Sequence, residues 1–411
     1  MREAARRGLR LAPPLLVLAL TSAWGNAGDE ALTAYRMRQY PRAFLLAQAA
    51  AKEGDYLGFF VMGRLYEKGQ GVPAQNRVAG DDWLRKALAK ATPAALSDKP
   101  RGQYVLAREN CHGRVLPQNV ASCASWLTKA AHLGYVPALA ELGVFNDPDA
   151  GYVKNGAKSF QFFLEAAGRG DAVSQAAVAT HYLYGSAVTK DVKAALAWYR
   201  KSADQGFVDG QAGLSLMYDD GIGVPADPRT AAHWERLAAE QGAAADQNQL
   251  ALMYANGHGV ALDYEEAAAW YRRAADQGNA DAQYGLGTAL ANGLGVEKDE
   301  NEAALWYRRA AEQGSADAQY ALGAMEYHGQ GTYKDRGEAM TWVRKAADQG
   351  HAQAQYVMGL MYSQGFQTAK NDDQAMLWFQ KSAKQGNAQA AQAVQQLAGI
   401  RRGTAADPRP R

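Results

Sequence analysis

The sequence has few of the residues that would support metal chemistry or nucleic-acid binding. Its 411 residues include two cysteines and seven histidines, and no Cys/His cluster or helical His pair has the spacing of a zinc site. The formal net charge is +2, and the four arginines and one glutamate of residues 1–27 account for more than this excess. The rest of the chain has no basic surplus, so neither nucleic acid nor an anionic membrane is an expected partner.

The apolar stretch at the start of the chain is too short to cross a bilayer. It covers Leu11–Leu20 and contains two prolines, whereas a spanning helix needs about 20 apolar residues. The stretch follows a basic start and precedes Gly25-Asn26-Ala27, which suits cleavage, and no cysteine lies nearby for lipid attachment. We therefore predict a signal peptide over residues 1–27, release into the periplasm and no stable membrane insertion.

Regular spacing of glycine and tryptophan predicts the architecture of the rest. Three sets of residues recur every 36 positions: Gly170, Gly206, Gly242, Gly278, Gly314, Gly350 and Gly386; Gly185, Gly221, Gly257, Gly293, Gly329 and Gly365; and Trp198, Trp234, Trp270, Trp306, Trp342 and Trp378. Self-similarity at this period indicates a solenoid of stacked units rather than one globular core.

Each unit is predicted to be a helix, a glycine turn, a second helix and a glycine cap. In the unit Gly278–Gln313, a segment with helical apolar spacing leads to a turn at Gly293 and Gly295. Asp299 and Glu302 then form a capping box, in which Asp299 accepts from the new helix and Glu302 reaches back. An alanine column in the second helices allows close helix approach, and the tryptophan column buries apolar area.

These residues resemble the Sel1-like repeat family. The pattern A-x-A-Q-Y-x-L-G…G-x-G-V-x-x-D-x-x-x-A-x-x-W-Y-x-x-A-A-x-Q-G is clearest in Ala280–Gly314 and Ala316–Gly350, and the resemblance covers about residues 54–398. It implies an all-α, right-handed superhelical solenoid of helix-turn-helix repeats, related to tetratricopeptide repeats, with a concave face lined by the first helices.

We expect four segments along the chain. Residues 1–27 are the signal peptide, 28–53 are N-terminal capping helices, 54–398 hold about nine repeats, and 399–411 form a disordered tail. The first three repeats are divergent, and about eight extra residues lie near Thr92–Pro100.

No arrangement in the sequence indicates catalysis, a cofactor or a metal ion. Residues 90–160, the most divergent region, show no nucleophile–base pair, so a hidden hydrolase is not favoured. His258 occupies a variable turn position and is predicted to face solvent. Cys111 and Cys123 fall near the same end of one hairpin, which predicts a disulfide in an oxidising compartment; the alternative is two buried thiols.

Positions that vary between repeats indicate where a partner binds. We define the first-helix stripe as three positions of each first helix, spaced i, i+4 and i+7, together with the aspartates beside them. The resemblance to tetratricopeptide repeats places this stripe on the concave face. The alternative is that its tyrosines belong to the family pattern and only pack neighbouring repeats. The predicted contact residues are Leu216, Asp219, Leu252, Asp281, Tyr284, Asp317, Tyr320, Tyr327, Tyr356 and Leu360.

The sequence therefore predicts a non-enzymatic periplasmic scaffold that binds another protein through its concave face. A narrower alternative follows from resemblance to periplasmic immunity proteins, some with such repeats, that occlude type VI secretion phospholipase effectors. Neither alternative requires a cofactor.

Overall fold

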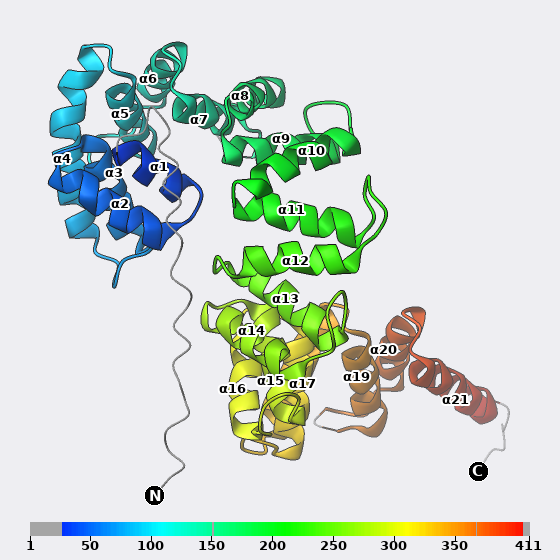
Figure 1. Cartoon of the computed structure of the whole chain (residues 1–411). Coiled ribbons are helices and arrows are strands. Elements are labelled where there is room, and N and C mark those ends of the chain that lie inside the picture. The colour runs from blue at the N-terminus through cyan, green and yellow to red at the C-terminus, as the bar shows by residue number, and fades with distance from the viewer. Residues whose placement is uncertain (1–26, 150–151, 367, 406–411) are drawn as a thin grey trace, which may run out of the picture. The chain divides into compact units, whose positions relative to one another are not determined.

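The computed structural model describes residues 27–149, 152–366 and 368–405. These residues form 21 helices and no strand, and the helices follow one another as pairs (Figure 1). The all-α fold of consecutive helix pairs predicted from the spacing is confirmed. The predicted signal peptide lies outside the described residues except for Ala27, which begins the first helix.

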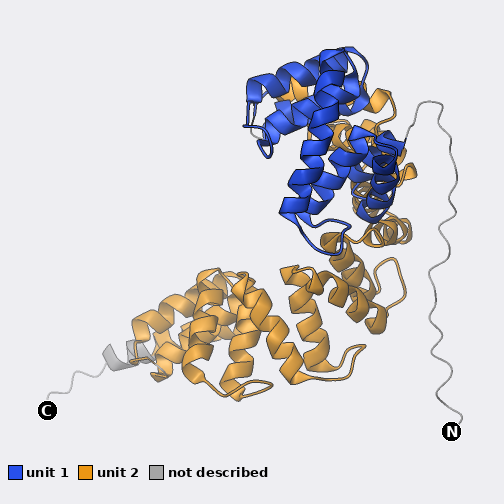
Figure 2. Cartoon of the chain, turned by 90° about the vertical axis from the view of Figure 1, so that its left-hand side faces the viewer, with its two compact units in different colours: residues 1–155 blue, residues 156–411 orange. Residues whose placement is uncertain are grey.

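The chain divides into two compact units, residues 1–155 and 156–411 (Figure 2). The first unit contains α1 (Ala27–Arg36), α2 (Tyr40–Lys52), α3 (Tyr56–Lys68), α4 (Arg77–Leu96), α5 (Pro100–His112), α6 (Val120–His132) and α7 (Val136–Asn146). The second contains α8 (Gly156–Gly168), α9 (Ala172–Tyr184), α10 (Val192–Asp204), α11 (Val208–Asp219), α12 (Pro228–Ala239), α13 (Ala244–Asn256), α14 (Tyr264–Asp276), α15 (Ala280–Asn292), α16 (Glu300–Glu312), α17 (Ala316–His328), α18 (Arg336–Asp348), α19 (Ala352–Gln364), α20 (Asp372–Lys384) and α21 (Ala388–Ala405).

Side-chain caps and glycine turns set the helix ends, as the sequence predicts. Asp299 accepts from the backbone N–H of Glu302 at 2.9 Å. Gly295 has φ 68°, and a Cβ there would lie 2.0 Å from the carbonyl oxygen of Tyr264, so no other residue fits this turn. The turn of one repeat thus lies against the start of the second helix of the repeat before it.

Glu302, the second residue of the predicted capping box, bonds other groups than the start of its own helix. The Glu302 carboxylate accepts from the Trp306 indole at 3.1 Å and from Arg272 of the preceding repeat at 2.7 Å. Glu338 likewise accepts from Trp342 and from Arg308. A tryptophan four residues later and a cation from the neighbouring repeat compete for the carboxylate, so it links repeats instead of closing its own cap.

The alanine and tryptophan columns form the core predicted for them. Ala303 is fully buried and Trp306 is 6% exposed, within one apolar cluster that extends over several repeats of the second unit. A cation three residues after the tryptophan lies over its ring in most repeats, for example Arg309 over Trp306 at 4.3 Å and Lys345 over Trp342 at 3.9 Å. In these repeats the indole is therefore packed between the core and a cation of its own helix.

A ladder of buried glutamines connects consecutive repeats. Gln283 of α15 donates to the carbonyl oxygen of Ala275, at the end of the preceding second helix, and accepts from Gln313, at the end of its own second helix. The glutamine pair recurs at 2.7–2.8 Å in six repeats: Gln205–Gln175, Gln241–Gln211, Gln277–Gln247, Gln313–Gln283, Gln349–Gln319 and Gln385–Gln355. Each glutamine of a first helix is 4–6% exposed, so the ladder is internal.

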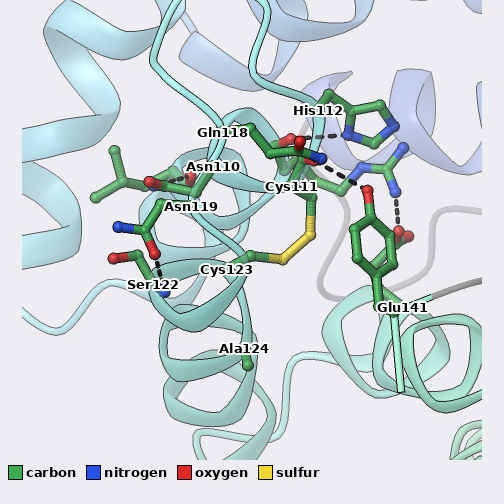
Figure 3. Close-up of a disulfide and its surroundings, with 12 residues drawn as sticks. Asn110, Cys111, His112, Gln118, Asn119, Ser122, Cys123, Ala124 and Glu141 are labelled. Atoms are coloured by element: carbon green, nitrogen blue, oxygen red, sulfur yellow. Dashed lines mark hydrogen bonds and ion pairs between the residues drawn. A yellow bond between two sulfur atoms is a disulfide. The ribbon is translucent and has the colours of Figure 1, made fainter. Parts of the chain in front are cut away.

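The first unit departs from the repeat pattern in two ways. The extra residues near Thr92–Pro100 extend α4 to 20 residues, where the second helices of regular repeats have 12 or 13. A disulfide joins Cys111 of α5 to Cys123 of α6, with Cα atoms 5.2 Å apart (Figure 3).

Neighbouring groups hold the end of α5 beside this disulfide. The Cys111 carbonyl accepts from the Gln118 amide at 2.8 Å and from the Tyr152 hydroxyl at 2.9 Å. These bonds and the disulfide fix a hairpin whose turn has Gly113 but lacks the second glycine of the regular repeats.

The C-terminal boundary expected from the sequence is wrong. The last helix continues to Ala405, whereas residues 399–411 were predicted to be disordered. Alanine and arginine favour helix, and no proline occurs between Ala388 and Asp407. Residues 406–411 lie outside the described part of the chain.

The ladder predicts that one glutamine stabilises two neighbouring helices. We expect Gln283→Ala to lower the free energy of opening of α15 and α16 by roughly 1–3 kcal/mol, because it removes two buried hydrogen bonds and leaves Gln313 without its acceptor. Hydrogen exchange of the α15 and α16 amides measures this change. The control is Gln330→Ala at an exposed turn position; equal protection in the two variants would contradict a structural role for the ladder.

Candidate functional site

The leucines of the first-helix stripe are open to solvent. Leu216 of α11 is 41% exposed and Leu252 of α13 is 38% exposed. Two leucines at one stripe position of consecutive repeats form an apolar track that the chain itself does not bury. Leu360 of α19, at the same position, is half-buried.

The three equivalent tyrosines of the stripe are half-buried against their own repeats. The ring centroid of Tyr284 lies 5.7 Å from that of Tyr307, and that of Tyr356 lies 5.7 Å from that of Phe379. Tyr320 stacks on His351 at 4.8 Å, and burial raises the pKa of its hydroxyl. Each ring packs on the chain with part of its surface and leaves the rest uncovered. This arrangement is compatible both with packing within repeats and with contact to a partner.

Stripe residues from neighbouring repeats line two apolar grooves of the second unit. The α13–α15 groove has a volume of about 240 Å³ and is formed by α13, α14, α15 and the turn after α15, with Leu252, Asp281 and Tyr284 among its lining residues. The α17–α19 groove, also about 240 Å³, includes Tyr320, Tyr327 and Leu360. Six of the ten predicted contact residues thus line grooves.

The other four predicted residues line neither groove. Leu216 and Tyr356 lie on the stripe outside them. Two aspartates are engaged by histidines of the chain: Asp219 accepts from His258 Nε2, and Asp317 lies 3.3 Å from His351 Nε2. His258 is 48% exposed at its turn, as expected, but the sequence did not predict its ion pair with the preceding repeat.

The α13–α15 groove contains two polar groups that the sequence reasoning missed. In two other repeats the second-helix tyrosine bonds a stripe threonine: Tyr199 with Thr180 at 2.9 Å, and Tyr307 with Thr288 at 3.1 Å. The equivalent of Tyr307 in this groove is Tyr271, which faces a leucine position instead of a threonine. Burial raises the pKa of Tyr271 to about 12, with no hydrogen bond among its causes.

Asn248 is the second of these polar groups. It occupies the stripe position where later repeats have tyrosine, and it is 9% exposed. Its Oδ1 is buried and has no hydrogen-bond partner in the described part of the chain. Alignment of the repeats could have pointed to both groups. Leu252 stands where the next repeat has Thr288, and Asn248 stands where it has Tyr284.

Lysine and arginine are absent from six first helices of the second unit and lie in its second helices and turns. The first helices α9, α11, α13, α15, α17 and α19 contain no lysine or arginine. They carry Asp209, Asp219, Asp246, Asp281, Asp317 and Glu326. The exposed carboxylates of Asp209, Asp281 and Asp317 favour basic partners on this surface.

A buried carboxyl group lies at the α11–α12 hairpin near the stripe. Glu235 of α12 occupies the position of Tyr271 and Tyr307 in the repeat that begins with α11, and it is 4% exposed. Burial raises its pKa to about 7, a hydrogen bond with Ser215 lowers it, and Asp246 and Asp219 raise it further.

Neither a metal-binding cluster nor a membrane-spanning helix occurs among the described residues. Residues 27–149, 152–366 and 368–405 contain no group of three or more His, Cys, Asp and Glu side chains placed to hold a metal ion. None of the helices in these ranges is long and apolar enough to cross a membrane.

The Sel1 repeat family model matches nine consecutive segments of the chain: 60–91, 100–135, 136–171, 172–207, 208–242, 244–279, 280–315, 316–351 and 352–387. Among solved structures, a protective antigen of uropathogenic Escherichia coli strains, described as an SLR fold, is 29% identical with a TM-score of 0.69. The similarity covers 92% of this chain and 88% of that one.

Two further solved structures extend the comparison. A Sel1 repeat protein from Oxalobacter formigenes is 30% identical with a TM-score of 0.55, over 75% of this chain and 90% of that one. An immunity protein from Pseudomonas aeruginosa is 18% identical with a TM-score of 0.24, over 61% of this chain and 81% of that one. A similarity at that level gives no information about a shared function.

The raised pKa of Glu235 predicts that stability falls at alkaline pH. Its folded pKa of about 7 exceeds the usual 4.5 of the unfolded chain, so its contribution is fully present below 4.5 and is lost as the pH rises through 7. We expect Glu235→Gln to stabilise the protein relative to the native chain at pH 8.5, by at most about 3 kcal/mol, and to make little difference at pH 4.5.

Urea unfolding at the two pH values measures this difference. The control is Glu240→Gln, an exposed residue at the end of the same helix. A Glu235→Gln variant that differs from the native chain equally at both pH values would contradict the raised pKa.

Proposed function

The chain belongs to the Sel1 repeat family, and we propose that it acts as a non-enzymatic scaffold that binds another protein along the first-helix stripe of its second unit. The single observation that carries this proposal is that stripe residues from successive repeats line two apolar grooves and leave Leu216 and Leu252 exposed. Apolar and tyrosine side chains beside grooves are typical anchors of protein interfaces.

The columns that build the repeats are occupied by structural contacts and cannot serve the partner. Most of the tryptophan rings lie under a Lys or Arg of their own helices, and the glutamines of the first helices are buried in the ladder. The stripe combines exposure with variation between repeats, so a partner would be recognised there. The narrower role of an immunity protein is supported by the sequence resemblance alone.

We propose export to the periplasm as the setting of this interaction. The proposal is supported by the signal-peptide pattern of residues 1–27 and by the Cys111–Cys123 pair. Disulfides of this kind persist in oxidising compartments and are rare in the cytosol.

The stripe leucines provide a test with matched controls. We expect the double variant Leu216→Ala and Leu252→Ala to bind the partner at least fivefold more weakly, about 1 kcal/mol, because it removes the exposed apolar track. The control is Leu305→Ala with Leu377→Ala, two exposed leucines of the second helices α16 and α20. The measurement is quantitative capture from periplasmic extract, with circular dichroism of each variant. Equal loss in both double variants, or no loss in the stripe variant, would contradict the proposal.

Export and the disulfide are tested together by mass spectrometry of protein from the periplasmic fraction. We expect an N-terminus near Asp29 or Gly28, because cleavage is predicted near Ala27, and a bridged peptide pair containing Cys111 and Cys123. Reduction should destabilise the α5–α6 hairpin by about 2–4 kcal/mol, as for other short loops. An intact Met1 with free thiols at both cysteines would exclude this location.

A further inference from the structure

The α13–α15 groove offers hydrogen-bond acceptors and aromatic rings but no cation. Its lining residues are Asn248, Leu252, Ala255, Tyr264, Ala267, Ala268, Tyr271, Asp281, Tyr284, Gly285, Thr288, Ala289 and Leu294. Three of them are tyrosines, one is an aspartate, and none is a lysine or an arginine. We propose that this groove binds an arginine side chain of the partner protein, an inference that rests on the proposed protein-binding function.

Asn248 supplies the first argument. Asn248 is 9% exposed. Its Oδ1 is buried and has no hydrogen-bond partner in the described part of the chain. An unsatisfied buried acceptor lowers stability unless a donor reaches it. A ligand with N–H groups satisfies this oxygen, and an apolar side chain does not.

Comparison of the two grooves supplies the second argument. In the α17–α19 groove, the chain's own Arg336 lies 5.5 Å from the centre of the Tyr327 ring and 5.4 Å from that of Phe366. Arg336 is the first residue of α18, and the equivalent first residue of α14 is Tyr264. Tyr264 therefore adds a ring to the lining of the α13–α15 groove at the position where Arg336 lies beside the other groove.

Other tyrosines of the first helices also receive a cation from the chain. Arg236 lies 5.5 Å from the Tyr254 ring centre, and Arg344 lies 5.7 Å from that of Tyr362. Within residues 152–366, none of the cation–ring contacts involves Tyr264, Tyr271 or Tyr284. Tyr264 is 39% exposed and Tyr284 is half-buried, so these two rings can meet a cation from outside, whereas Tyr271 is 7% exposed and lies in the core behind them.

Charge and shape favour arginine as the occupant. The exposed Asp281 carboxylate is part of the lining, and the surrounding first helices carry acidic residues without a lysine or an arginine. The walls are otherwise apolar, which suits the aliphatic stem of a long side chain. A guanidinium stacks on aromatic rings and presents five N–H donors to Asn248 and Asp281.

The test uses the full chain labelled with ¹⁵N at asparagine and the probe peptide acetyl-Gly-Gly-Arg-Gly-Gly-amide. The Asn248 carboxamide resonance is assigned with the Asn248→Ala variant, which should fold because alanine occupies the equivalent positions Ala176 and Ala212. We expect a saturable shift of this resonance with the arginine peptide. We expect no saturable shift with the same peptide carrying citrulline, which has nearly the same shape but no charge.

Two aspartate variants locate the charge. Asp281→Asn should weaken binding of the arginine peptide at least fivefold, whereas Asp317→Asn, the same repeat position outside the groove, should leave it unchanged. Equal binding of the citrulline peptide, equal effects of the two aspartate variants, or no saturable shift would overturn the proposal. The proposed function is tested separately, by partner capture with the stripe-leucine variant. Failure of the arginine site is therefore distinguishable from failure of the proposed function.

Discussion

The buried glutamine ladder is the constraint on which the arrangement of the repeats depends. Five of the six first-helix glutamines bond both the end of the preceding second helix and the end of their own second helix. Because an amide has one acceptor and two donors in fixed directions, these bonds set the rotation of three helices together. That rotation determines which side of every first helix is buried and which side carries the stripe. The ladder therefore leaves the stripe as a surface whose residues vary without loss of the fold.

The stripe carries different chemistry along the second unit. In the α13–α15 groove, Leu252 takes the place of a threonine and leaves the Tyr271 hydroxyl without that partner, and Asn248 takes the place of a tyrosine. Beside the α17–α19 groove, Arg336 lies over the half-buried rings of Tyr327 and Phe366. Repeats with one backbone design thus present one groove without a cation and another beside which Arg336 lies over two of the lining rings. A difference of this kind gives a solenoid specificity for one partner segment in one register.

Features repeated within the sequence were predictable, and features that depend on contacts between repeats were not. Asp299, Gly295 and the Trp306 column act locally or recur at a fixed period, so their roles follow from spacing. The use of Glu302 depends on Arg272 of another repeat, and the Asp219–His258 pair joins residues of two repeats. The motif contains both ladder glutamines, but spacing alone does not show that they meet. The extension of the last helix to Ala405 was missed because a polar composition was taken as a sign of disorder.

The candidate site could be predicted only in part from the sequence, because it too depends on contacts between repeats. Alignment of the repeats identified the stripe positions, and six of those residues line grooves, but their function as contact residues stays a prediction. The groove volumes and the lack of a hydrogen-bond partner at Asn248 Oδ1 depend on how neighbouring side chains pack. An alignment of the repeats does not contain that information. Departures from the repeat pattern were the useful signal: a polar residue in a tyrosine column marks the place where packing leaves a polar atom unpaired.

Site-specific photo-crosslinking in intact cells tests the central claim most directly. A photoreactive phenylalanine analogue at Leu252, on the stripe, is compared with the same analogue at Leu305, an exposed leucine of a second helix. A partner that lies along the first helices of the second unit gives one discrete crosslinked protein from position 252 and none from position 305. Crosslinks of equal yield from both positions, or from position 305 alone, would contradict binding along the stripe.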